Sequence, residues 1–170
     1  MSSAVFEIGP LRPHHDESSF SCGSDALDSY LRTQASQDIR RNVASCFVAT
    51  TDDARVVGFY TLASSSLPLT DLPAETRKRL PGYAVVPAVR IERLAVDKSC
   101  SGRGLGSALL SNAIRRTLTS GIASFAVVVD AKDEAAARFY AHHGSIALPD
   151  AALTLFLPMA TVRALMHKHP

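Results

Sequence analysis

Three glycines stand at alternate positions in the segment Gly102-Arg103-Gly104-Leu105-Gly106. An apolar stretch precedes them and apolar residues at helical spacing follow, so the segment is predicted to join a strand to the start of a helix. Glycine lets the backbone approach a ligand without a Cβ, and the first N–H groups of a helix favour an anion. The segment therefore predicts binding of a phosphate-bearing cofactor.

The residues around these glycines argue against a nucleoside triphosphate site. Such a loop needs Lys followed by Ser or Thr after its last glycine, whereas Gly106 is followed by Ser107 and Ala108. A dinucleotide fingerprint requires Gly or Ala where Ser107 stands and an acidic residue about 20 positions further on. Asp130 is the nearest candidate for that acid, so the dinucleotide site stays open as an alternative. An ordinary strand-to-helix turn, which needs only one glycine, is the other.

Two motifs resemble those of the GNAT N-acetyltransferases. The segment from Gly102 to Ser107 looks like the acyl-CoA pyrophosphate loop of that superfamily, written Gln or Arg, two residues, Gly, one residue, then Gly or Ala. Gly104 and Gly106 fit its last two positions, and Ser101 stands at the first. Downstream, Phe139-Tyr140-Ala141-His142-His143-Gly144 resembles the Phe-Tyr, three residues, Gly-Phe end of the superfamily, with Ser145 in place of the final aromatic. The resemblance implies an α/β GNAT fold, in which a mixed central sheet with splayed middle strands is flanked by helices.

The same resemblance implies acetyl-CoA as co-substrate and assigns residues to it. The strand before the loop offers backbone groups to the pantetheine arm, and the loop holds the pyrophosphate. The residues expected to contact the cofactor are Leu94, Ala95, Val96, Ser101, Gly102, Arg103, Gly104, Leu105, Gly106, Ser107, Asp130 and Phe139.

Tyr140 is the expected catalytic residue. A phenol with a pKa near 10 is protonated at neutral pH and can protonate the departing thiolate. The alternative for Tyr140 is a buried aromatic on an amphipathic helix. For a general base, Glu92 and Asp130 are the nearby carboxylates, although Glu92 is equally consistent with a surface charge paired with Arg90 or Arg77. A base is unnecessary for an aminoacyl ester, because its α-amine has a pKa near 8 that the ester lowers further, so it arrives mostly neutral, unlike a lysine side chain with a pKa near 10.4.

A narrower resemblance covers about residues 20–159. It rests on Phe20-x-Cys22-Gly23, Leu27-Asp28-x-Tyr30-Leu31, Gly58-Phe59-Tyr60-Thr61-Leu62-Ala63, Val86-Pro87, Arg93-Leu94-Ala95-Val96-Asp97 and Leu155-Phe156-Leu157-Pro158, which resemble segments of the GNAT toxins of bacterial toxin-antitoxin modules. The resemblance implies acetylation of the α-amino group of aminoacyl-tRNA, which blocks translation. It also implies neutralisation by a ribbon-helix-helix antitoxin, contact with operator DNA only through the antitoxin complex, and a homodimer.

Charge supports a nucleic-acid acceptor only moderately. The formal net charge of +2 is far below that of a dedicated nucleic-acid-binding protein. Basic side chains that could contact tRNA phosphates are Arg40, Arg41, Arg77, Lys78, Arg79, Arg90 and Arg93. For the run from Arg77 to Arg79, a solvated helix face is the alternative. Two other functions stay open: acetylation of a small-molecule or protein amine, and a non-catalytic acyl-CoA-binding partner of a DNA-binding repressor.

The composition predicts one soluble domain over residues 1–170, with 46% hydrophobic and 20% charged residues. Apolar runs are too short for a membrane span, and residues 1–10 lack the features of a signal peptide, so we expect a cytoplasmic protein without membrane contact. Three widely spaced cysteines predict reduced thiols, and the histidine pairs lack the spacing of metal ligands, so no metal is expected.

The elements that must position these residues follow from hydrophobic periodicity. Strands are predicted at residues 5–8, 44–50, 55–63, 88–96, 124–129 and 153–157. Helices are predicted from Ser24 to about Arg40, near residues 72–80, after Gly104, at 133–142 and at 159–167, with a loop over residues 64–87 around the second of them.

Overall fold

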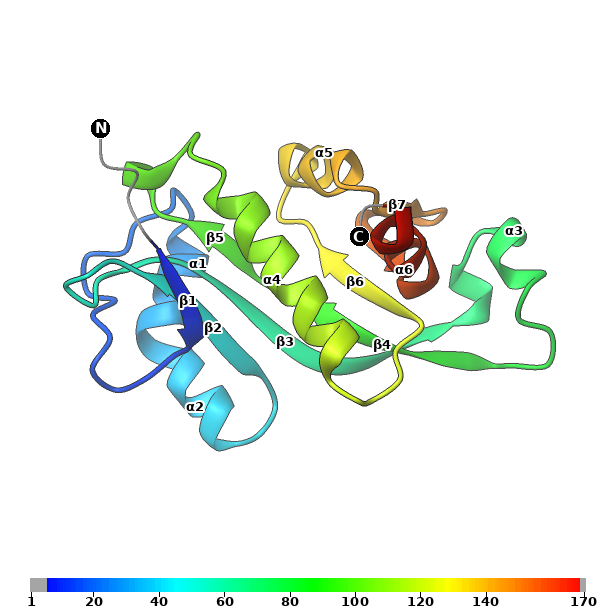
Figure 1. Cartoon of the computed structure of the whole chain (residues 1–170), viewed down its shortest axis with the longest axis horizontal. Coiled ribbons are helices and arrows are strands. Elements are labelled where there is room, and N and C mark those ends of the chain that lie inside the picture. The colour runs from blue at the N-terminus through cyan, green and yellow to red at the C-terminus, as the bar shows by residue number, and fades with distance from the viewer. Residues whose placement is uncertain (1–5, 169–170) are drawn as a thin grey trace. The chain divides into compact units, whose positions relative to one another are not determined.

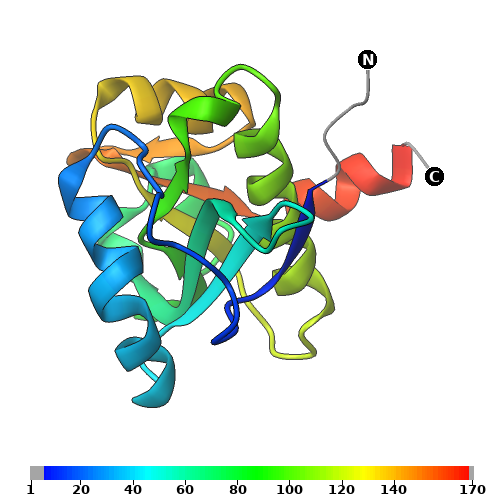
Figure 2. The same ribbon diagram turned by 90° about the vertical axis from the view of Figure 1, so that its left-hand side faces the viewer.

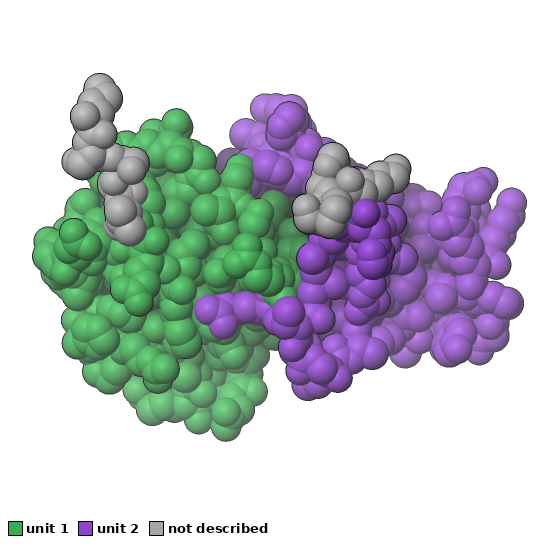
Figure 3. All heavy atoms as spheres, in the orientation of Figure 1, with its two compact units in different colours: residues 1–63, 93–115 green, residues 64–92, 116–170 purple. Residues whose placement is uncertain are grey.

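The computed structural model describes residues 6–168, which fall into two compact units. The first unit holds the chain up to residue 63 together with residues 93–115, and the second holds residues 64–92 and the chain from residue 116 onward (Figure 3). Each unit therefore combines two separate stretches of sequence. The expectation of a single domain stays a prediction.

Eight strands form a mixed sheet, flanked by helices (Figure 1). They are β1 (Glu7–Pro10), β2 (Ser45–Thr50), β3 (Val56–Pro68), β4 (Val85–Ile91), β5 (Leu94–Val96), β6 (Ala126–Asp130), β7 (Ile146–Leu148) and β8 (Ala151–Pro158). The hydrogen-bonded order is β1-β2-β3-β4-β6-β8-β7, and β5 pairs with β3. β4 and β6 are parallel, whereas β1–β2, β2–β3, β3–β5, β6–β8 and β7–β8 are antiparallel.

The first helical segment is interrupted in its middle. It consists of α1 (Asp25–Ser29), a π-helical turn η1 (Tyr30–Gln34) and α2 (Ala35–Arg40). The Oγ atom of Ser24 accepts a hydrogen bond from Leu27 N, which confirms the predicted start of this segment. The other helices are η2 (Leu69–Asp71) and η3 (Lys98–Cys100), which are 3₁₀ turns, and α3 (Ala74–Arg77), α4 (Leu105–Thr119), α5 (Glu134–His142) and α6 (Met159–Lys168).

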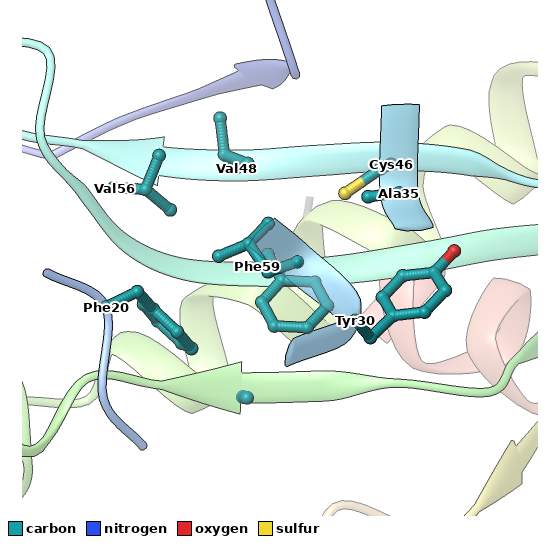
Figure 4. Close-up of a cluster of buried hydrophobic side chains, with 9 residues drawn as sticks. Phe20, Tyr30, Ala35, Cys46, Val48, Val56 and Phe59 are labelled. Atoms are coloured by element: carbon teal, nitrogen blue, oxygen red, sulfur yellow. The ribbon is translucent and has the colours of Figure 1, made fainter. Parts of the chain in front are cut away.

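The core of the first unit lies on one face of β3. Phe59 packs there with Phe20 and Tyr30, and the Phe20 ring meets it edge-on at a centroid distance of 5.6 Å (Figure 4). Neighbouring residues of a strand point to opposite faces, so Gly58 faces the other way, toward Leu105 and Leu109 of α4. Helices α1 and α2 therefore cover one face of these strands, as Figure 2 shows, and the start of α4 covers the other.

The core of the second unit surrounds β6. Residues 126–129 of β6 are almost fully buried, which confirms the prediction of a strand covered on both faces. Ala126 and Val128 pack with Leu67, Val86, Ala88 and Phe156, among others.

Several predicted elements differ from the structure in their bounds, and one strand was missed. The single strand expected at residues 88–96 is two strands, because β4 pairs with β6 up to the pair Ile91–Val129 and residues 94–96 pair with β3 instead. The expected loop from residue 64 is shorter, since β3 runs on to Pro68 and β4 starts at Val85. The short edge strand β7 was not predicted. Of the strand expected at residues 5–8, Val5 lies outside the described residues, and β1 runs to Pro10.

Within residues 6–168, no helix combines the length and apolar character needed to cross a membrane.

Candidate active site

Asp97 fixes the start of the loop that carries the three glycines. Its side chain is 5% exposed, and both of its oxygens accept hydrogen bonds: Oδ1 from Ser99 N (2.9 Å) and Ser99 Oγ (2.8 Å), and Oδ2 from Ser21 N (2.9 Å). Burial alone would raise the pKa of Asp97, but these hydrogen bonds, with the charge of Arg55, lower it below its usual value. A charged Asp97 thus caps η3, the turn that leads into the loop.

The glycines at 102 and 104 have a backbone that other residues rarely adopt. Their φ angles are +75° and +77°, and a Cβ at either position would meet no atom within 4 Å, so backbone conformation rather than lack of space requires glycine. Residues 101–104 are exposed, while Cys100 and Leu105 on either side are buried. We call residues 101–107 the phosphate loop.

Helix α4 begins at the end of this loop and suits an anion. Ala108 N donates to Gly104 O at the start of the helix, and the first N–H groups of an α-helix point along its axis toward the preceding loop. The first turn of α4 contains no acidic residue that would oppose an anion. A diphosphate fits this arrangement of exposed glycine backbone and helix N-terminus.

Contacts with β3 hold α4 in place. A Cβ at Gly58 would lie 2.9 Å from Leu109 Cδ1 and 3.3 Å from Leu105 Cδ2, so the glycine permits a close approach of helix and strand. The hydroxyl of buried Tyr60 donates to Asn112 Oδ1 on α4 at 2.5 Å. This role of Gly58 was not predicted, although a glycine inside an apolar strand is a signal for a close approach.

Strand β5 has one paired edge among the described residues. Leu94, Ala95 and Val96 pair with Tyr60, Phe59 and Gly58, and β5 has no second partner strand within residues 6–168. Ala95 packs in the core of the first unit, whereas Leu94 and Val96 are half-buried. The second edge offers backbone N–H and C=O groups, which suits the predicted contact with an amide-containing arm such as pantetheine.

Tyr140 lies in the second unit, on α5. Asp133 caps this helix by accepting a hydrogen bond from Ala136 N, and the helix ends before Gly144, whose φ is +99°. The Tyr140 side chain is 4% exposed, and the ring of Phe139 meets it edge-on at 5.3 Å. Burial first, and the negative charge of Asp130 second, raise the pKa of the Tyr140 phenol well above its usual value.

The hydroxyl of Tyr140 differs from those of the other two buried tyrosines. Tyr30 Oη donates to Asp38 Oδ2 at 2.8 Å and Tyr60 Oη to Asn112 Oδ1, whereas Tyr140 Oη makes no hydrogen bond to any residue in the described part of the chain. No fully buried side-chain polar atom in that part lacks a partner, so Tyr140 Oη retains some surface access. A buried phenol of this kind can donate to a bound molecule.

Asp130 is held by an ion pair. Arg90 Nη1 lies 2.6 Å from Asp130 Oδ1 and 2.8 Å from Oδ2, and Arg90 Nε donates to Ser65 Oγ. This pair opposes a free role of Asp130 as general base, and it also engages Arg90, one of the predicted phosphate contacts. The alternative for Glu92, a surface charge paired with Arg90 or Arg77, stays a prediction, and the ion pair of Arg90 with Asp130 does not include it. Glu92 itself is exposed between β4 and β5.

The remaining basic candidates occupy different settings. Arg40 and Arg41 are exposed at the end of α2, and Arg77, Lys78 and Arg79 are exposed at and after the end of α3, in the second unit. The guanidinium carbon of Arg93 lies 3.7 Å from the centroid of the Tyr30 ring, a cation–π contact. In the first unit, the structure thus contains the phosphate loop, residues 94–96, Arg40, Arg41 and Arg93. In the second, it contains Tyr140, Phe139, Asp130, Glu92, Arg90 and residues 77–79.

These features define an acetyl-CoA-dependent acyltransferase of the GNAT type. The profile of the Acetyltransferase (GNAT) family matches residues 11–144, and the chain belongs to this family. It is 42% identical over 153 residues to the tRNA-acetylating toxin of Mycobacterium tuberculosis, with 89% of this chain and 90% of that protein covered. It is also 33% identical over 172 residues to the probable toxin TacT of Sinorhizobium fredii, with 94% of each covered.

Solved structures agree with this assignment. A tyrosine-to-phenylalanine mutant of KacT superposes with a TM-score of 0.87 at 27% identity, covering 94% of this chain and 98% of that one. AtaT complexed with acetyl-methionyl-tRNAfMet gives 0.85 at 28% identity, with 95% and 99% covered. AtaTR bound with acetyl-CoA gives 0.81 at 27% identity (95% and 98%), and an AtaT mutant toxin bound to the C-terminus of the antitoxin AtaR gives 0.80 at 25% (94% and 97%). The predicted GNAT fold is confirmed.

Proposed function

We propose that the protein transfers an acetyl group from acetyl-CoA to the α-amino group of an aminoacyl-tRNA and so inhibits translation. The observation that carries the chemistry is the hydroxyl of Tyr140, which is buried, protonated and without a hydrogen-bond acceptor among residues 6–168. The names of the similar proteins, a tRNA-acetylating toxin and a complex with acetyl-methionyl-tRNA, support the acceptor class.

In this proposal the phosphate loop and the start of α4 bind the diphosphate, and the backbone of residues 94–96 aligns the pantetheine arm. Bound acetyl-CoA supplies an activated acetyl group and a thiolate leaving group. The acceptor amine forms the new N–C bond as the C–S bond breaks, and Tyr140 gives its proton to the sulfur. Because the pKa of Tyr140 is raised, the phenolate recovers a proton readily, and the proton lost by the amine restores it.

No base is required of the protein if the amine arrives neutral. The α-amine of an aminoacyl ester has a pKa near 8 or lower, whereas a lysine amine near 10.4 is almost fully charged at neutral pH. The ion pair of Asp130 with Arg90 agrees with a mechanism that does not use that carboxylate as a base. The exposed basic residues Arg40, Arg41, Arg77, Lys78 and Arg79, with Arg93 on the ring of Tyr30, are proposed to contact tRNA phosphates.

The proposal includes a partner. The structural similarity to a toxin bound by the C-terminus of its antitoxin, and to toxin–antitoxin complexes bound to DNA, supports neutralisation by an antitoxin through which the complex reaches operator DNA. We propose that this antitoxin is of the ribbon-helix-helix type. We also propose a homodimer that acts in the cytoplasm, where charged tRNA is found.

The test is incubation of the purified protein with labelled acetyl-CoA and total tRNA, either aminoacylated or deacylated. Label on charged tRNA alone, removed by hydrolysis of the aminoacyl ester, supports the proposal. Label on protein or small amines instead identifies a different acceptor class, and absence of label from charged tRNA overturns the proposed function. Expression should arrest growth, and a neighbouring ribbon-helix-helix gene should relieve the arrest.

A further inference from the structure

The segment Phe20-x-Cys22-Gly23 is hydrogen-bonded to Asp97 and Lys98, which precede the phosphate loop, although the sequence separates them by more than 70 residues. Ser21 N donates to Asp97 Oδ2, and Lys98 N donates back to Ser21 O at 2.9 Å. We call residues 20–23 the rear turn. Two hydrogen bonds of opposite direction thus join the rear turn to the residues that begin η3.

The rear turn is itself fixed to the first helical segment. Cys22 N donates to Asp28 Oδ1 on α1 at 2.9 Å, and Arg32 Nη1 on η1 donates to Phe20 O at 2.9 Å. The Phe20 ring is 1% exposed in the core of the first unit. The turn is therefore a rigid support, anchored by a buried ring and by helix side chains.

Asp97 is the side chain that connects this support to the loop. One of its oxygens binds the rear turn, and the other binds the N–H and hydroxyl of Ser99 within η3. Its own N–H donates to Val57 O of β3 at 2.8 Å, and Cys100 N donates to Asp97 O at 2.9 Å. The path of the chain from β5 into Ser101 is thus determined at Asp97.

We propose that Asp97 is a positioning residue for the donor: by linking the rear turn to η3, it holds the phosphate loop in the conformation that binds the diphosphate of acetyl-CoA. An array of backbone N–H groups binds an anion well only when it is ordered beforehand, since ordering a loop on binding weakens affinity. The proposal rests on the donor part of the proposed function and not on the acceptor. It explains why motifs around residues 20, 28 and 97 serve one site.

The decisive variant is Asp97→Asn. An amide has one accepting oxygen, so its NH₂ group must face either Ser21 N–H or Ser99 N–H, and one link is lost. We expect binding of acetyl-CoA, measured by calorimetry, to weaken roughly 10- to 100-fold, because small displacements of a binding group have effects of this size. The matched control is Asp28→Asn, which is also 5% exposed and also holds the rear turn. Its amide oxygen can still accept from Cys22 N, so acetyl-CoA affinity should change by less than about twofold.

A truncated donor separates positioning from a general structural defect. Acetyl-pantetheine carries the thioester and the arm but no diphosphate, so Asp97→Asn should leave its kcat/KM with charged tRNA unchanged while raising the KM for acetyl-CoA. Equal losses with both donors, or unchanged acetyl-CoA affinity in a folded variant, overturn the proposal. If Asp97→Asn does not fold, Ser99→Ala decides: it removes one bond to Asp97 and should weaken acetyl-CoA binding about two- to fivefold, and no change overturns the proposal. Wild-type protein that does not bind acetyl-CoA would instead refute the proposed function.

Discussion

Replacing Tyr140 by Phe should separate the effect on activity from the effect on stability. The substitution removes one oxygen and keeps the buried ring, so the contact with Phe139 remains. Because Tyr140 Oη makes no hydrogen bond to residues 6–168, its loss leaves no buried partner unsatisfied there. The free energy of unfolding should therefore change by less than about 0.5 kcal/mol.

The effect on turnover should be far larger. A positioned general acid contributes about 10²- to 10⁴-fold to a rate, which corresponds to roughly 2.7–5.4 kcal/mol of transition-state stabilisation. The affinity for acetyl-CoA should change by less than about threefold, because the residues expected to bind the cofactor, 94–96 and the phosphate loop, are unchanged in this variant. Three measurements suffice: urea unfolding, calorimetry with acetyl-CoA, and single-turnover transfer to charged tRNA.

Tyr30→Phe is the matched control. It removes a hydroxyl from an equally buried tyrosine whose Oη donates to the carboxylate of Asp38. Loss of this hydrogen bond to a carboxylate should lower the free energy of unfolding by about 1.5–3 kcal/mol. The value of kcat should change little, because the ring under Arg93 remains. If Tyr140→Phe lost stability like this control and kept its kcat, Tyr140 would be a packing residue and not the general acid.

Three further predictions test the loop and the two strand-terminal carboxylates. Gly104 and the control position Gly121 have φ angles of +77° and +78°, and both have open space around them. Replacement by Ala should lower the free energy of unfolding by about 1–2 kcal/mol at each position. Only Gly104→Ala should raise the KM for acetyl-CoA in steady-state kinetics. In Asp130→Asn, kcat should fall less than about tenfold in steady-state kinetics, because this carboxylate is held by Arg90 and is not required to accept a proton; a loss beyond about 10³ would make Asp130 the base. Since the folded-state pKa of Asp97 is depressed, its charge stabilises the protein above its unfolded-state pKa of about 3.9, and this stabilisation is lost as pH falls through the lower folded-state value. In urea titrations, the unfolding free energies of wild type and Asp97→Asn should therefore converge at that low pH. A difference that persists at still lower pH would contradict this prediction.

Local features of the site were predictable because local sequence determines them. A positive φ favours glycine, so Gly102 and Gly104 indicate an unusual loop, and the apolar spacing after Gly104 predicts α4. The end of α5 before Gly144 follows from the same preference. These elements were predicted without knowledge of their neighbours.

Non-local pairing was not predictable in the same way. Residues 88–96 were predicted as one strand although Glu92 and Arg93 stand in its middle, and the local sequence does not indicate that its first part pairs with β6 and its last part with β3. The partner of Arg90 also depends on register: Arg90 lies opposite Val128 in the parallel pair of β4 and β6, which brings the side chain two residues further on, Asp130, within reach. Glu92, closer in sequence, is not that partner.

Asp97 and Asp130 show why residue type alone does not assign chemistry. Each follows the last apolar residue of a strand, so their sequence contexts are alike. Asp97 accepts hydrogen bonds from backbone N–H groups of the 3₁₀ turn η3 and of the rear turn. These bonds keep Asp97 charged and give it a structural role before the phosphate loop. Asp130 forms an ion pair with the guanidinium of Arg90, and the negative charge of Asp130 raises the pKa of Tyr140. The partner that the fold supplies decides the role.

This division of roles bears on the choice of acceptor. With Asp130 committed to Arg90 and Asp97 to the loop, neither of these carboxylates is free to remove a proton from an ammonium group. An amine that arrives neutral needs no base, and amines with pKa values near 8 and 10.4 differ about 250-fold in their neutral fraction at neutral pH. A reaction without a protein base thus favours an α-amino ester over a lysine side chain by this factor, before any contact with the rest of the acceptor. Selection among α-amines is left to the surfaces that bind the tRNA.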